Sequence, residues 1–144
     1  MKKETNYISI LEKILLHLKN AKLSYVKASD KAIFPEDKRH FNKHTTLRNR
    51  FFLEIQSILY SKNIELDDLI IENFNYDQLL ISPLNKKKIT ACEKCILADK
   101  IIMDLYKSLE ELEMMNPSFL LHVETISDAL EKNETYLEKF PVQV

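Results

Sequence analysis

The sequence predicts an all-α protein, a ferritin-like four-helix bundle in which two antiparallel helical hairpins are joined by a long packed crossover. The first observation is that the 144 residues contain no glycine, where ordinary usage of about 7% would supply roughly ten. Glycine serves tight turns and β-bulges, so its absence favours long helices. The second is that apolar residues recur at helical spacing in four stretches, with a proline at or near each boundary between them.

The first two helices are expected over residues 7–33 and 36–62. Apolar side chains such as Leu11 and Leu15 recur every three or four residues in the first of them, which predicts an amphipathic helix. Pro35 suits the first position of the second helix, and the two acidic residues that follow it favour the positive end of the helix dipole. The short link between the two helices predicts an antiparallel hairpin.

The second hairpin follows a crossover over residues 63–85, which is too apolar for an exposed loop and is therefore expected to pack against the bundle. The third helix is predicted over 86–115 and the fourth over 117–139. Asn116 and Pro117 form an N-cap followed by proline at the first helical position, which marks the start of the fourth helix. All 144 residues are assigned to one bundle domain.

The charge balance argues against nucleic-acid and membrane partners. Lysine and arginine number 21 against 22 aspartates and glutamates, a net charge of −1 at pH 7, which gives no general attraction to nucleic acid or anionic lipid. No run of about 18 apolar residues, as a spanning helix requires, is present. Two cysteines without a signal sequence predict a cytoplasmic protein. The lack of glycine also excludes Walker loops and dinucleotide-binding turns.

A bundle of this shape raises the question of a di-iron site. Such sites use a Glu-x-x-His pair on each of two helices, because that spacing places both ligands on one helix face. The chain has four histidines, and the residues three positions before them are Ile14, Asp37, Phe41 and Phe119. None of these is a glutamate, so the standard di-iron motif is absent.

Several polar residues nevertheless lie in line with the inward apolar stripes. The candidates are Glu54, Asp99, Tyr25, Tyr106 and His44. One interpretation is a small buried site in which Glu54 and Asp99 hold a metal, with iron as the candidate ion. The other is a hydrogen-bonded network that also includes Arg48, fixes the register of the helices and is capped by the tyrosine hydroxyls.

The two cysteines, Cys92 and Cys95, form a C-x-x-C motif. In redox enzymes this motif sits at a helix N-terminus, where the dipole lowers the pKa of the first thiol. Here it is expected two turns inside the third helix. Core packing of two small buried residues is one interpretation, and a redox or metal role is the other.

The third helix carries a recognisable pattern. Cys95 is followed by Ala98, Asp99 and, seven positions after the acid, Tyr106. This resembles the third-helix signature of the domain of unknown function 2383 family, bacterial ferritin-like four-helix-bundle proteins. The Ser24–Ala28 segment of the first helix is similar to that family's Gly-Tyr-x-x-Ala. The resemblance covers residues 7–138 and implies a ferritin-like bundle.

The expected function is that of a non-enzymatic cytoplasmic protein that acts through contact with a protein partner or through self-association, as in a dimer, and needs no cofactor. This expectation follows from the lack of any complete catalytic constellation in the sequence. The alternative is a degenerate ferritin-like protein that binds metal or handles oxidants through Glu54, Asp99 and the tyrosines. A third reading is redox sensing by the cysteine pair.

Overall fold

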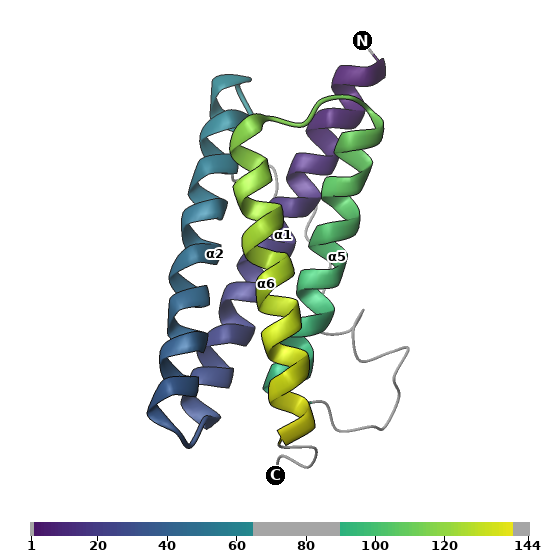
Figure 1. Cartoon of the computed structure of the whole chain (residues 1–144). Coiled ribbons are helices and arrows are strands. Elements are labelled where there is room, and N and C mark those ends of the chain that lie inside the picture. Colours follow the sequence, from purple (N-terminus) through teal and green to yellow (C-terminus); the bar gives the residue numbers. More distant parts are fainter. Residues whose placement is uncertain (1, 65–89, 140–144) are drawn as a thin grey trace, which may run out of the picture.

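The computed structural model describes residues 2–64 and 90–139, and these ranges contain four α-helices and no strand. The helices are α1 (Lys2–Lys31), α2 (Pro35–Ser61), α5 (Ala91–Glu111) and α6 (Pro117–Lys139). They lie alongside one another as a bundle (Figure 1). The predicted all-α four-helix architecture is therefore confirmed. Most of the predicted crossover, residues 65–85, lies outside the described part of the chain.

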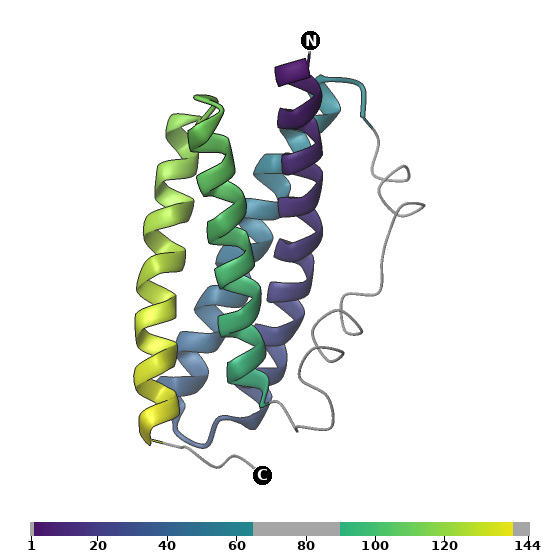
Figure 2. The ribbon, with the colours of Figure 1, turned by 90° about the vertical axis from the view of Figure 1, so that its right-hand side faces the viewer.

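Each helix runs antiparallel to its neighbours. α1 packs against both α2 and α5, and α5 packs against α6 (Figures 1 and 2). α2 and α5 run in the same direction, so α2 ends at one end of the bundle and α5 begins at the other. α6 closes the bundle beside α2, where aromatic and polar side chains fill the seam between the two helices.

The helix ends agree with the sequence except at α1 and α5. α2 and α6 lie within one residue of their predicted bounds, whereas α1 begins at Lys2, five residues before its predicted start. α5 begins at Ala91, because Thr90 is extended and forms a capping box with Glu93, so a helix continuous from residue 86 is wrong. Residues 86–89 themselves lie outside the described part of the chain. The predicted end at 115 is also wrong, since Glu113 is left-handed at φ 59° and ends the helix after Glu111.

The inner faces of the helices form two apolar regions. In the larger, leucines and isoleucines of α1 pack against Phe51 and Ile55 of α2 and against Ile102 and Leu109 of α5. In the smaller, Tyr25 and Ala28 of α1 come together with Phe41 of α2 and with Cys92 and Cys95 of α5. Every buried stripe recurs at three- and four-residue steps, the spacing of an amphipathic helix. Of the helices described, none combines the length and the apolar character that crossing a bilayer demands.

Candidate functional site

A buried polar group joins all four helices, and we call it the Asp99 network. Its central members are Tyr25 of α1, Arg48 of α2, Asp99 of α5 and Asn133 of α6. All four are fully buried, at 0% exposure. Buried polar groups are costly unless each finds a partner, so the contacts within the network decide whether the fold tolerates it.

The centre of the network is an ion pair with two parallel hydrogen bonds. Arg48 Nε donates to Asp99 Oδ1 at 3.1 Å, and its Nη2 donates to Oδ2 at 2.9 Å. The Tyr25 hydroxyl donates to the same Oδ2 at 2.5 Å. The guanidinium carbon also lies 4.9 Å from the centre of the Tyr25 ring, a cation–π contact. Both carboxylate oxygens are thus occupied by donors from α1 and α2.

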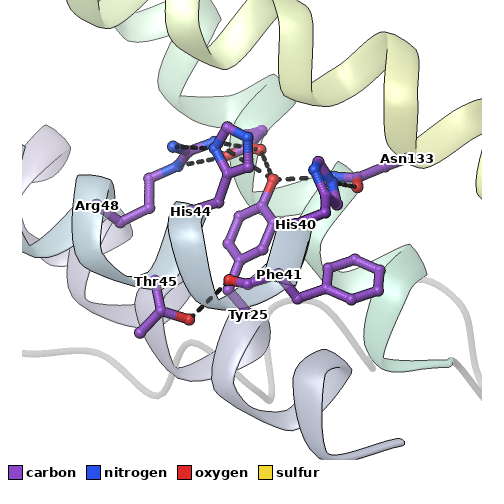
Figure 3. A network of polar contacts seen from close by, with 8 residues as sticks. Tyr25, His40, Phe41, His44, Thr45, Arg48 and Asn133 are labelled. Atoms are coloured by element: carbon purple, nitrogen blue, oxygen red, sulfur yellow. Dashed lines mark hydrogen bonds and ion pairs between the residues drawn. The ribbon is translucent and has the colours of Figure 1, made fainter. Parts of the chain in front are cut away.

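The periphery of the network completes its hydrogen bonding (Figure 3). Asn133 Nδ2 donates to the Tyr25 hydroxyl at 2.9 Å, and His40 Nε2 lies 2.8 Å from Asn133 Oδ1. Arg48 Nη1 lies 3.2 Å from His44 Nδ1. A guanidinium only donates, so His44 accepts at Nδ1 and carries its proton on Nε2. The four central side chains therefore all have hydrogen-bond partners within the network, as expected of a network that fixes the register of the helices.

Burial and the neighbouring charges fix the protonation states of Tyr25, Arg48 and His44. Burial and the neighbouring Asp99 raise the pKa of Tyr25 well above its ordinary value, so the phenol stays protonated. Burial is the largest single effect on Arg48 and opposes its charge, but the attractions of Asp99 and Tyr25 and the hydrogen bond to Asp99 together outweigh it and raise the pKa of the guanidinium. Burial, followed by repulsion from Arg48, lowers the pKa of His44 to about 3. The imidazole is therefore neutral at neutral pH.

A second polar group lies nearer the other end of α2, and we call it the His122 relay. Tyr106 of α5 places its hydroxyl 2.6 Å from His122 Nδ1 of α6. His122 Nε2 lies 3.1 Å from Glu54 Oε2 of α2. Phe51 stacks on the imidazole, with ring centroids 3.9 Å apart. Tyr106 and His122 are buried, whereas the Glu54 side chain is 40% exposed.

The structure divides the predicted candidate residues between these two groups. Tyr25, Asp99 and His44 belong to the Asp99 network, and Tyr106 and Glu54 belong to the His122 relay. The proposed metal ligands Glu54 and Asp99 therefore have no partner in common. In the described ranges no group of three or more histidine, cysteine or acidic side chains is placed to hold a metal. The side chains around Asp99 do not fit a divalent ion, because the Arg48 cation takes up both of its oxygens.

This arrangement predicts the outcome of a metal-binding measurement. Protein incubated anaerobically with Fe(II), desalted and analysed by elemental mass spectrometry is expected to retain no stoichiometric iron. The physical reason is that an entering cation would have to displace the buried guanidinium of Arg48. One iron per chain in the wild type, lost in a folded Asp99→Asn variant, would contradict this expectation.

The cysteines occupy a different position from the one expected. Because α5 begins at Ala91, Cys92 lies in its first turn and not two turns inside the helix. Burial nevertheless raises the pKa of Cys92 to about 12, followed by repulsion from Glu93. Burial and then Asp99 raise the pKa of Cys95 as well. Both are free thiols, and Cys92 Sγ donates to the Asn133 carbonyl at 3.6 Å. Neither resembles an activated thiolate, and their packing in the smaller apolar region is the better description.

Two central members of these groups are not among the sequence candidates: His122 and Asn133. Both belong to the buried stripe of α6, which reads Phe119, His122, Ile126, Ala129 and Asn133. Its steps of three and four residues are the signal that identifies them as inward-facing. A histidine and an asparagine at stripe positions are as informative as the acid and the arginine on the facing helices.

Comparison of the chain with family models, with curated proteins and with solved structures finds no match.

Proposed function

We propose that this protein is a non-enzymatic helical bundle of the cytoplasm that acts by contacting a protein, namely a second copy of itself. The observation that carries the proposal is an open hollow of about 680 Å³ between the middle of α2 and the start of α6. Its wall contains an exposed apolar side chain and charges of both signs. Such a surface is complementary to itself.

The composition of the hollow supports a two-fold contact. Leu53 lies in its wall and is 52% exposed. Arg50 and Glu54, one helical turn apart, flank this leucine with opposite charges. In an isologous dimer the same patch meets itself in reverse order. Arg50 of one copy would then approach Glu54 of the other, while the two leucines become buried.

The enclosed Asp99 network supports a non-enzymatic role. A catalytic group must come within hydrogen-bond reach of its substrate. The four central residues of the Asp99 network are fully enclosed, and their hydrogen bonds are made to one another. Their arrangement suits a structural function. The balanced net charge supports a protein partner and not a nucleic acid.

The proposal includes the ferritin-like class and the resemblance to the domain of unknown function 2383 family. In favour of it, α2 and α5 run in the same direction (Figure 1), so residues 65–89 join the end of α2 to a helix that begins at the opposite end of the bundle. One long connection of this kind is typical of ferritin-like bundles. Asp99 and Tyr106, on which the resemblance rests, both face the core. The two free cysteines suit a reducing compartment.

Self-association is tested by size-exclusion chromatography with light scattering over a range of concentrations. The wild type is expected to form a dimer at high micromolar concentration. Leu53→Glu is expected to weaken the dimer by at least about tenfold, because it places a charge at the centre of an apolar contact. Leu23→Glu is the matched control, since Leu23 is 50% exposed but lies on α1 outside the hollow. A strict monomer, or equal effects of both variants, would refute the proposal.

A further inference from the structure

The His122 relay is a hydrogen-bonded chain with one direction. Glu54 Oε2 only accepts when ionised, so His122 donates to it from Nε2 over 3.1 Å. A neutral imidazole that carries its proton on Nε2 accepts at Nδ1. The Tyr106 hydroxyl, 2.6 Å from Nδ1, therefore donates its proton there. The order of donors runs from the buried phenol through the imidazole to a carboxylate at the surface.

The setting of the relay suits the transfer of a proton over a short, fixed distance. Tyr106 is 1% exposed and His122 is 0% exposed, so bulk water does not compete for their hydrogen bond. Phe51 stacks on one face of the imidazole, and Phe119 packs against both rings. Burial lowers the pKa of His122 against the opposing effect of Glu54, which keeps Nδ1 unprotonated and ready to accept.

We propose that Tyr106 is a site of reversible one-electron oxidation, with His122 as the acceptor of its proton. In this step the phenol gives one electron to an outer-sphere one-electron oxidant outside the chain, such as an oxidising radical. Its O–H bond breaks and the proton forms an N–H bond at His122 Nδ1. The Nε2 proton passes to the Glu54 carboxylate. The products are a neutral tyrosyl radical, a neutral imidazole, a protonated Glu54 and the reduced oxidant, so protons and electrons balance.

The contrast with Tyr25 shows why this activity belongs to Tyr106. The Tyr25 phenol also donates to a carboxylate, at 2.5 Å from Asp99 Oδ2. That carboxylate is paired with Arg48 in the closed core. A proton moved to Asp99 would leave the Arg48 cation buried without a counter-charge, which is strongly unfavourable. In the His122 relay the change of charge ends on Glu54, whose side chain is 40% exposed to water.

All three proton-bearing groups lie within one chain, so the relay needs no second copy, although Glu54 also lines the proposed dimer contact. The experiment is therefore run on protein dilute enough to be monomeric by light scattering, which separates its outcome from that of the self-association test. The test uses the full-length protein with photogenerated tris(bipyridine)ruthenium(III) as the oxidant. Rapid freeze-quenching and electron paramagnetic resonance then detect a tyrosyl radical. Tyr106→Phe is expected to lose the long-lived signal. Tyr60→Phe, which removes a tyrosine that is 50% exposed on α2, is the matched control and is expected to keep it.

A second variant tests the role of the proton path. Glu54→Gln leaves a hydrogen-bond partner for His122 Nε2 but cannot take up the proton. It is expected to slow radical formation at least about tenfold, as loss of a positioned base does, with unchanged helix content. A solvent deuterium isotope effect should be present in the wild type. A radical that persists in Tyr106→Phe, or a rate that is the same in Glu54→Gln and the wild type, would overturn the proposal.

Discussion

Replacement of Asp99 by alanine is expected to lower the free energy of unfolding by about 3 to 5 kcal/mol. The variant leaves the Arg48 guanidinium fully buried with no counter-charge and deprives the Tyr25 hydroxyl of its acceptor. A loss of this size is a large part of the stability of an ordinary domain. Urea unfolding followed by circular dichroism measures it. Asp104→Ala, on the exposed side of the same helix, is the control and should change the stability by less than about 0.5 kcal/mol.

A double variant separates two causes of this loss of stability: the missing ion pair, and the buried Arg48 charge that is left without a partner. Arg48→Met together with Asp99→Leu removes both charges while it keeps apolar volume in the core. Because replacement of a buried ion pair by apolar residues is often neutral or stabilising, the double variant should be clearly more stable than Asp99→Ala. If the double variant is as unstable as the single one, the penalty does not arise from the unpaired Arg48 cation.

Mild acid is expected to destabilise the bundle by about 2 kcal/mol between pH 7 and pH 5. Burial lowers the pKa of His17 to about 4, and burial together with Arg48 lowers that of His44 to about 3. Below an unfolded pKa of about 6.5, the unfolded chain binds protons at these positions that the folded chain does not. Stability is therefore complete above this pH and is lost as the pH falls toward the folded values. The expected loss of stability is smaller than two fully enclosed imidazoles would give, because His17 and His44 keep some contact with solvent.

The measurement is the urea midpoint at a series of pH values over this range, in which histidine is the side chain that titrates. His44→Gln serves as the comparison, because a glutamine oxygen is able to accept from Arg48 Nη1 in place of the imidazole. This variant should lose stability less steeply on acidification than the wild type does. A midpoint that does not move from pH 7 to pH 5 would contradict the assigned neutral state of the buried histidines.

The sequence is sufficient for the four helices and for most of the inward-facing polar residues. Hydrophobic periodicity places Arg48 and Asp99 on inner stripes, since each lies three or four residues from buried apolar neighbours. Periodicity does not show that Arg48 and Asp99 lie opposite each other, because the axial offset between two helices depends on packing across the bundle. The separation of Glu54 from Asp99 follows from the axial offset between α2 and α5, and only the structure shows this offset.

The errors in the predicted helix bounds have local causes. The lysines before Ile89 continue a helical pattern in the sequence and so predict an earlier start for α5, although Thr90 and Glu93 have the spacing of a capping box. The end of α5 has no glycine to mark it, because a left-handed glutamate, Glu113, stands where glycine is usual. Where a chain lacks glycine, the residue at which a helix stops has no distinctive identity in the sequence.

The division of the Asp99 network between the two hairpins has a consequence for assembly. Tyr25 and Arg48 lie on the α1–α2 hairpin, while Asp99 and Asn133 lie on the α5–α6 hairpin. Neither hairpin alone contains the counter-charge of its own buried ion. The separate α1–α2 hairpin would keep Arg48 unpaired on the face that it has to bury, and the separate α5–α6 hairpin would keep Asp99 unpaired. Each hairpin therefore needs the other in order to fold stably, and the native state is expected to fold and unfold in one cooperative transition.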